Sequence, residues 1–280
     1  MKKITVIMGI FCILTLANCV SAKTVSGNTR VETRTFDLKD FDSIAFYLPS
    51  SEADIIQGDE YKVEISLDSN LFEFVDISVQ QLEKKLTLIQ KRNTQLKPSL
   101  FKISVTMPIL KSLSIAGITK TAVSGFHNEN QPLSLNISGI SSITADVSAS
   151  TIKADISGIG NINLKAKSKK CLFTISGSGE MTADINSTDT DSTISGRGDL
   201  YLKGKTEKCS FTVSGSAKIK AFDLETEEAV CTISGLGKVE INAKNRLEAD
   251  VSGSGTVRYA GNPQHINLHS SGMGSIKKIE

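Results

Sequence analysis

Carboxylates beside lysines offer the first candidate chemistry in this sequence, because enzymes that cleave polysaccharides use paired Asp or Glu side chains with basic groups nearby. Asp146 and Asp184 lie 38 residues apart with Lys165 midway between them, and Asp155 and Asp250 are farther apart still. These spacings are multiples of a repeat near 19 residues, so they predict charged surface columns rather than a carboxylate pair at catalytic distance. We therefore predict no catalytic residues and no enzyme. A degenerate carbohydrate-active enzyme is the alternative of a different class.

Histidine and cysteine are the usual ligands of transition metals, yet their spacing here does not suit a metal. His265 and His269 are four residues apart, which on a strand puts them on one side at about 13 Å. Cys171 and Cys209 are 38 residues apart, so two turns of a repeat separate them by ~10 Å, too far for a disulfide. They are predicted to be small buried hydrophobic residues, and Cys231 leaves an odd count. We predict no metal and no cofactor.

Hydroxyl side chains form the candidate binding surface. Four successive repeats carry a Thr and a Ser two residues apart, at positions predicted to face outward: Thr174 and Ser176, Thr193 and Ser195, Thr212 and Ser214, Thr232 and Ser234. Flat arrays of this kind can order water or contact ice or glycans, although Thr also simply suits an exposed strand. Arg197-Gly198-Asp199 spells an integrin-binding tripeptide, but Gly198 belongs to the repeat, so the spelling is read as coincidental.

An internal repeat must position these side chains, and it dominates the sequence. A Gly recurs at intervals of 18 to 20 residues, after a first interval of 22 that an insertion at 126–132 explains, and in most repeats it follows an apolar-Ser pair, with Gly117 as a weaker first member: Gly117, Gly139, Gly158, Gly177, Gly196, Gly215, Gly235, Gly253 and Gly272. Six repeats add a second Gly two residues later, and these glycines are predicted to let the backbone bend through conformations that other residues resist. Such periodicity indicates a solenoid.

The residues around each Gly explain the repeat. The position two residues before it is Ile or Val in eight of nine repeats, as in Ile156, Ile175 and Ile194, and the position four residues after it is also apolar in eight of nine. Polar residues alternate with these apolar ones, so each arm is a strand. Stacking the turns would bury one continuous apolar column. The predicted fold is all-β, a parallel β-helix with rungs of about 19 residues; a β-propeller would need a period of roughly 40.

The N-terminal third lacks the Gly repeat but still alternates as strands do. Strands are expected at 41–48, 61–67, 86–90 and 101–107, a loop at 92–99, and either a helix or a strand at 71–75. Residues 36–112 are read as an irregular β start that covers the first regular rung, and 113–280 as the regular rungs of a single domain, 23–280. The last rung is predicted to end either in a charged, blunt edge or in an edge that associates with another copy of the chain.

The first 22 residues have the features of a signal peptide: two lysines, an apolar run, and small residues before a predicted cut at Lys23. Leu16-Ala17-Asn18-Cys19 has the shape of a lipobox, so acylation of Cys19 is the alternative. Removing residues 1–22 takes two lysines and no acid, leaving 30 basic and 30 acidic residues. A neutral mature protein argues against a nucleic-acid partner.

The Ser-Gly-x-Gly repeats, together with Phe41 to Ile44 and with Ile103 to Leu110 leading into the first repeat, resemble the putative auto-transporter adhesin, head GIN domain family. The resemblance spans about residues 36–280. It implies a right-handed β-helix, export to the periplasm or outer-membrane surface, and no catalytic residues. The predicted function is a non-catalytic binding protein, an adhesin, whose partner is a protein or glycan of the host or envelope. A structural, self-associating scaffold is the second hypothesis.

Overall fold

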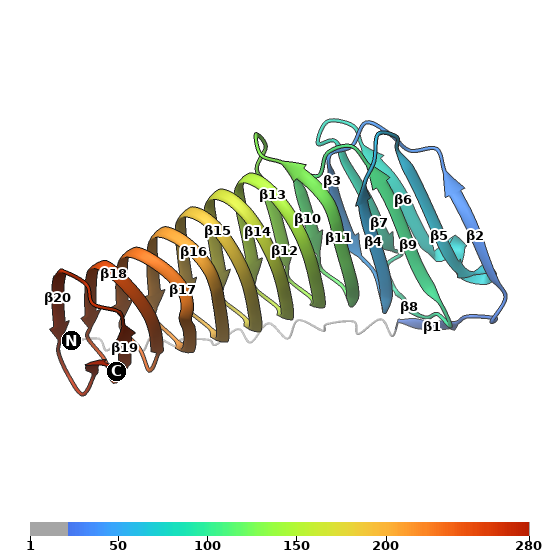
Figure 1. Ribbon diagram of the computed structural model, residues 1–280. Coiled ribbons are helices and arrows are strands. Elements are labelled where there is room, and N and C mark those ends of the chain that lie inside the picture. Colours follow the sequence, from blue (N-terminus) through green and yellow to red (C-terminus); the bar gives the residue numbers. More distant parts are fainter. Residues whose placement is uncertain (1–21, 280) are drawn as a thin grey trace, which may run out of the picture.

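The computed structural model describes residues 22–279, and most of the chain forms a rod of stacked parallel strands (Figure 1). The predicted lipidation residue Cys19 and most of the predicted signal peptide lie outside the described residues. Each central rung, meaning one turn of the coil, is a single long strand that bends around the rod: β13 (Ile140–Ile156), β14 (Ile159–Ile175), β15 (Ser178–Ile194), β16 (Arg197–Val213), β17 (Ser216–Ile233) and β18 (Lys238–Val251).

Parallel register between successive rungs confirms the predicted β-helix. Ile156 is paired with Ile175, and Ile175 with Ile194, so residues 19 apart lie directly over one another. All three side chains are about 1% exposed. The rungs toward either end of this regular stretch are broken into shorter strands: β10 (Ser112–Ile115), β11 (Thr119–Asn128), β12 (Leu133–Ile137), β19 (Thr256–Ala260), β20 (His265–Ser270) and β21 (Ser275–Lys278).

A second inward column alternates large and small side chains. Phe173 and Phe211 are buried, and Ser192 lies between them in register. The next position beyond Phe211 is Cys231, which is fully buried. A small residue beside each phenylalanine gives the ring room at a rung spacing of about 4.8 Å, so large and small side chains complement one another along the column.

The regular coil begins earlier than the predicted boundary at residue 113. Strands β3 (Ser43–Tyr47) and β4 (Ser51–Gln57) pair in parallel with β10 and β11, so residues 43–57 form a rung of the same coil. The glycine repeat misses this rung because its corner is Leu48-Pro49-Ser50 and contains no Gly.

The remaining N-terminal strands close one end of the rod as a cap (Figure 1). In the cap, β7 and β9 continue the parallel stacking on β3 and β4, whereas β2, β5 and β6 pair antiparallel. Buried Leu71 and Phe72 join the core from the 3-10 helix η1. The cap elements are β1 (Lys23–Ser26), β2 (Val31–Phe36), β5 (Lys62–Asp68), η1 (Ser69–Phe74), β6 (Val75–Gln80), β7 (Lys85–Gln90), β8 (Thr94–Lys97) and β9 (Phe101–Met107).

Two expectations for the cap are settled by these strands. The ambiguous segment at 71–75 is mostly helical, since η1 extends to Phe74. The loop predicted at 92–99 was wrong, because it contains β8, which pairs in parallel with β1. Leu96 points into the core at 5% exposure, and this single buried side chain holds an otherwise polar segment in the fold.

The cysteines occupy the core as predicted. Cys171 and Cys209 share a column with Thr190 between them, and Cys171, Cys209 and Cys231 are free and buried. Burial raises the pKa of the Cys209 thiol to about 12 and also raises the pKa values of Cys171 and Cys231. Neutral, buried thiols are poor nucleophiles.

We therefore expect the three thiols of the chain from Lys23 onward to be unreactive toward Ellman's reagent at pH 8 in the folded protein. All three should react in urea. Thiols of the unfolded chain ionise near pH 9.0, whereas Cys209 in the fold keeps its proton to about pH 12. Over that range the unfolded state releases protons that the folded state retains, so the free energy of unfolding should fall as pH rises. Rapid native reactivity would contradict this burial.

Candidate binding site along the glycine corner

The glycine corner is the tightest part of each rung. A Cβ atom built on Gly177 would lie 2.1 Å from the carbonyl oxygen of Gly158, and one on Gly158 would lie 2.2 Å from that of Gly139. Among the repeat glycines only Gly272 has a positive φ. The predicted reason for these glycines, backbone conformations that other residues resist, was therefore wrong for most of them. Glycine is needed because successive rungs approach too closely for any side chain.

Hydrogen bonds between rungs hold this corner. In five rungs the residue after the repeat glycine donates its N–H to the glycine carbonyl of the preceding rung, at 2.9 Å from Ile140 to Gly117 and 3.0 Å from Ile159 to Gly139. The same bond links Ser178 to Gly158. The side chain of the residue after the glycine points away from the core, and it is exposed in every rung.

A groove of about 350 Å³ follows this corner along the rod axis, and we call it the corner groove. It lies between the column of residues directly after the glycines and the column two residues farther on, and it crosses several rungs from the β3–β4 corner to β15. Its lining residues are Ser50, Ser51, Glu52, Ile118, Thr119, Lys120, Ile140, Ser141, Ser142, Ile159, Gly160, Asn161 and Ser178.

One wall of the corner groove is apolar. Ile118, Ile140 and Ile159 come from three successive rungs and are 51%, 57% and 59% exposed. Ile140 and Ile159 are paired in register, so the three side chains form a row with a spacing of about 4.8 Å. Isolated exposed apolar residues need no explanation, but a contiguous row beside a groove is typical of a binding surface.

The floor and the second wall of the corner groove are polar. On the floor, the Ser51 and Thr119 hydroxyls lie 3.0 Å apart, and the Ser141 hydroxyl donates to the Gly117 carbonyl at 2.9 Å. These hydroxyls are buried and hydrogen-bonded within the fold, which holds the floor in place. The second wall carries Glu52 and Lys120, which are neighbours in register and opposite in charge. The groove is thus amphipathic and close to neutral.

The predicted Thr and Ser positions lie on the other flank of the same corner, and we call them the hydroxyl ladder. Thr174, Thr193, Thr212 and Thr232 are paired one rung to the next. Thr174 is half-buried and the remaining ladder residues are exposed: Ser176, Thr193, Ser195, Thr212, Ser214, Thr232 and Ser234. The ladder and the corner groove meet at the rung of Gly177, where Ser176 and Ser178 lie on either side of the glycine, so both follow the same corner of the rod.

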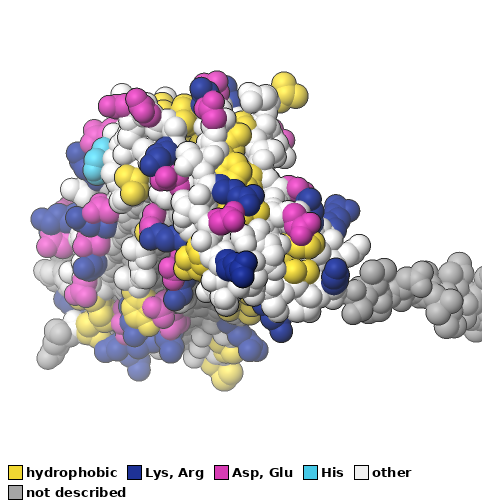
Figure 2. Space-filling view, turned by 90° about the vertical axis from the view of Figure 1, so that its right-hand side faces the viewer, with side chains coloured by type: hydrophobic (Ala, Val, Ile, Leu, Met, Phe, Trp, Pro, Cys, Tyr) yellow, Lys and Arg dark blue, Asp and Glu magenta, His cyan; other side chains and the backbone are white. Residues whose placement is uncertain are grey.

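Charged side chains on the arms away from this corner neutralise one another across rungs. Lys165 contacts Asp146 at 3.3 Å and Lys203 contacts Asp184 at 3.2 Å, in one column of alternating sign. The predicted charged surface column is confirmed by this geometry. Figure 2, which looks at the capped side, also has Lys and Arg interspersed with Asp and Glu rather than gathered by sign.

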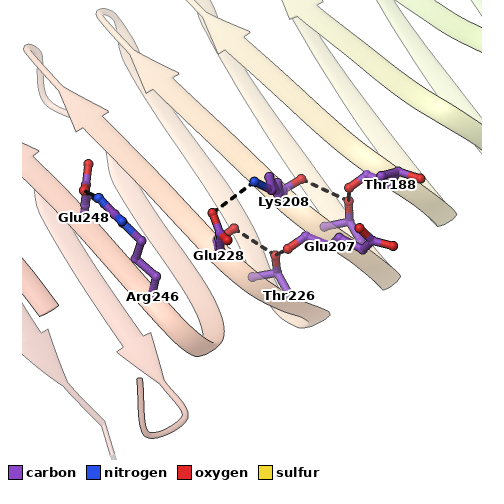
Figure 3. A network of polar contacts seen from close by, with 8 residues as sticks. Thr188, Glu207, Lys208, Thr226, Glu228, Arg246 and Glu248 are labelled. Carbon is purple, nitrogen blue, oxygen red and sulfur yellow. Dashed lines mark hydrogen bonds and ion pairs between the residues drawn. The ribbon is translucent and has the colours of Figure 1, made fainter. Parts of the chain in front are cut away.

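The second bend is built differently, and in the rungs of β16 and β17 threonine hydroxyls bond there to backbone carbonyls (Figure 3). The Thr206 hydroxyl contacts the carbonyl oxygens of Thr188 and Lys208, both at 3.1 Å, and Thr226 contacts those of Glu207 and Glu228. Lys208 and Glu228 form an ion pair across the outside of this bend. The buried hydroxyls are therefore committed to the fold.

The other residues singled out in the sequence do not form a site. His265 and His269 are exposed on β20, four residues apart. Asp199 of the Arg197-Gly198-Asp199 tripeptide lies 3.4 Å from the Tyr201 hydroxyl, within the regular wall of the rod. In residues 22–279 no group of three or more His, Cys, Asp or Glu residues is placed to hold a metal. The same residues include no helix long and apolar enough to cross a membrane.

A family model described as putative auto-transporter adhesin, head GIN domain, matches residues 40–184 and 166–263. The chain belongs to this family. The matched ranges include β3 and β4, the whole corner groove and the hydroxyl ladder, so the candidate face lies within the family's own domain. No curated protein matches the chain.

Solved structures extend the family likeness to the whole fold. A putative lipid binding protein from Parabacteroides distasonis is similar with a TM-score of 0.70 and 26% identity, over 92% of this chain and 100% of that one. A putative adhesin from Parabacteroides merdae is similar with a TM-score of 0.71 and 22% identity, over the same shares. A second protein from P. distasonis, also a putative adhesin, has a TM-score of 0.69 and 22% identity, again with 92% and 100% covered.

The corner groove was missed in the sequence, although a signal for it is present. The residue directly after the repeat glycine is Ile in the first three repeats, at Ile118, Ile140 and Ile159, and Ser or Arg in the next three. An apolar residue at a position that the repeat turns outward indicates an exposed apolar row. Recognising it required knowing that this position cannot face the core.

Proposed function

We propose that this protein is a non-catalytic, exported binding protein that holds an uncharged, amphipathic partner along the glycine corner. The corner groove carries the proposal, because an isoleucine row opposite a polar wall suits an elongated molecule with one apolar and one polar side. The hydroxyl ladder extends the contact toward the C-terminal rungs. The partner would be a component of a host or envelope surface, such as a neutral glycan or a lipid.

The distribution of charge supports an uncharged partner. Along the columns that flank the repeat glycines, from three residues before each to one residue after, only a few residues are ionisable: Asp155, Arg197, Asp250 and His269. The second wall of the corner groove adds Glu52 and Lys120, which are paired in register and opposite in charge. Lysines, aspartates and glutamates are numerous on the arms, where they pair with each other. A partner bound by this face would gain from apolar contact and hydrogen bonds, and little from long-range electrostatic attraction.

The family and its relatives support the same class of function. Adhesins act at exported or surface locations, and the relative with 26% identity is described as a putative lipid binding protein. Cleavage before Lys23 would leave every described strand intact, since β1 begins there. Acylation of Cys19 would instead tether the chain four residues before β1, within about 14 Å of the cap. Mass spectrometry of the mature N-terminus distinguishes the two.

The proposal is tested on arrays of neutral and anionic glycans and lipids probed with the chain from Lys23 onward. We expect binding to uncharged members, with less than a twofold change in signal between about 0.05 M and about 0.5 M NaCl, because screening acts on charge pairs. Binding confined to anionic members and lost at high salt would contradict it. Release of reducing sugar from any bound glycan would contradict the non-catalytic role.

A further inference from the structure

Within residues 22–279, the hydrophobic core of the rod is uncovered at the last rung. Ile266 and Leu268 on β20 occupy inward columns, in register with Leu247 and Ala249 of β18. Leu247 and Ala249 are 0% and 3% exposed, whereas Ile266 and Leu268 are 49% and 39% exposed. Ile266 and Leu268 therefore lie in the columns that form the core of the other rungs, but no further described rung covers them at the end of the rod. Terminal rungs of solenoids need a polar outer face or a cover, and this one has neither on β20.

The backbone of the last rung is unpaired on the same side. Among the described strands, β20 pairs with β18 alone and β21 with β19 alone. Lys277 and Lys278 guard β21, which is the usual protection of an edge. All six residues of β20 are exposed, and the strand contains no Lys, Arg, Asp or Glu to guard it. Half of the edge is therefore both apolar and unprotected.

The opposite end of the rod is protected differently: its outer strand β2, which among the described strands pairs with β5 alone, carries the charged residues Glu32 and Arg34 that guard an edge (Figure 1). There, η1 and the antiparallel strands cover the core, with Leu71 and Phe72 packed into it. Head-to-tail stacking of copies would place an open strand edge against this cover (Figure 1). The surface complementary to the last rung on a second copy is the last rung itself, which is the self-matching arrangement of a two-fold axis.

We propose that the last rung is an interaction surface for a second copy of this chain, with β20 pairing antiparallel to β20 of the partner. The pairing joins the two open cores and makes one doubled rod with a cap at each end. It closes at two copies, so it gives a dimer and not a filament. This inference stands independently of the proposed function, because the corner groove lies toward the capped end.

The contact is small, since it is the cross-section of one rung, and stable interfaces bury about 800 Å² per partner. We therefore expect a dimer that forms with increasing concentration. Sedimentation velocity of the chain from Lys23 onward should detect monomer at about 5 µM and a growing dimer fraction toward about 500 µM. A monomer throughout this range, or mass growth beyond the dimer, would overturn the proposal.

Two variants test whether the dimer forms through the last rung. Ile266→Lys with Leu268→Lys should abolish the dimer, because it places charge on both open core positions. Val230→Lys is the matched control: Val230 is 39% exposed, as Leu268 is, but lies on β17 along the rod wall. The control should dimerise as the unmodified chain does. Circular dichroism checks that both variants remain folded, and a dimer unaffected by the double substitution would refute the assignment.

The direction of pairing is read with spin labels at single introduced cysteines, since the native cysteines are buried. Labels at Gln264→Cys, next to β20, should lie close together across the dimer. Labels at Glu83→Cys, in the cap, should be far apart at the two tips of the doubled rod. Close approach of the Glu83 labels would indicate a side-by-side or cap-to-cap dimer and would contradict pairing through the last rung.

Discussion

Gly177→Ala should lower the free energy of unfolding by about 3 kcal/mol or more, as overpacked sites that cannot relax do. The added Cβ would lie 2.1 Å from the Gly158 carbonyl oxygen and 2.5 Å from that of Ser157. Both atoms belong to the backbone of the preceding rung, which is itself held by the rung before it, so the contact cannot be relieved by turning a side chain. Urea denaturation followed by circular dichroism measures the loss.

Substitutions at two neighbouring positions should lower stability less than Gly177→Ala does. Ser178→Ala changes an exposed residue of the same corner and should alter stability by less than about 0.5 kcal/mol. Gly179→Ala should fall between the two, because the equivalent slot two rungs later holds Ala217. If Gly177→Ala were as stable as Ser178→Ala, close stacking of the glycine carbonyls would not be the reason for the repeat.

Phe211→Ala should destabilise the protein by about 4 kcal/mol, within the range measured for buried phenylalanines. Phe211 is completely buried, with the small residues Ser192 and Cys231 in the rungs on either side. Neither neighbour can expand into the space of the missing ring, so a cavity would remain. A solenoid rung contacts only its immediate neighbours, so the loss is concentrated in that part of the rod.

Thr212→Ala is the control for the core substitution. Thr212 follows Phe211 in the same strand but faces outward as a member of the hydroxyl ladder, and its loss should cost less than about 1 kcal/mol. Thermal unfolding of both variants would compare them directly. Equal destabilisation by the two substitutions would mean that the inward and outward faces of β16 are not as distinct as the alternating burial indicates.

The coil could be predicted from the sequence because one physical rule fixes it. When apolar residues recur every 19 positions, as Ile156, Ile175 and Ile194 do, stacking is the arrangement that buries all of them together. The same rule placed Cys171 and Cys209 two rungs apart and the threonines of the ladder in one outward column.

The cap and the first rung could not be predicted in this way, because no repeat marks them. Strand β8 is held by one buried side chain, Leu96, and by pairing with β1, a contact between segments about 70 residues apart. The corner groove was missed for a related reason. Its isoleucines are exposed because the corner glycines leave no room on the inside, and that closeness is visible only once Gly139 and Gly158 are stacked.

The most direct test of the corner groove is the affinity of the uncharged array ligand with the strongest signal for two lysine variants, measured by calorimetry. Ile140→Lys with Ile159→Lys replaces two members of the isoleucine row. Leu236→Lys changes the same column four rungs away, where Leu236 is 67% exposed. We expect the double variant to bind at least about 100-fold more weakly and the Leu236 variant to bind unchanged. Unaltered affinity of the double variant would contradict binding in the corner groove.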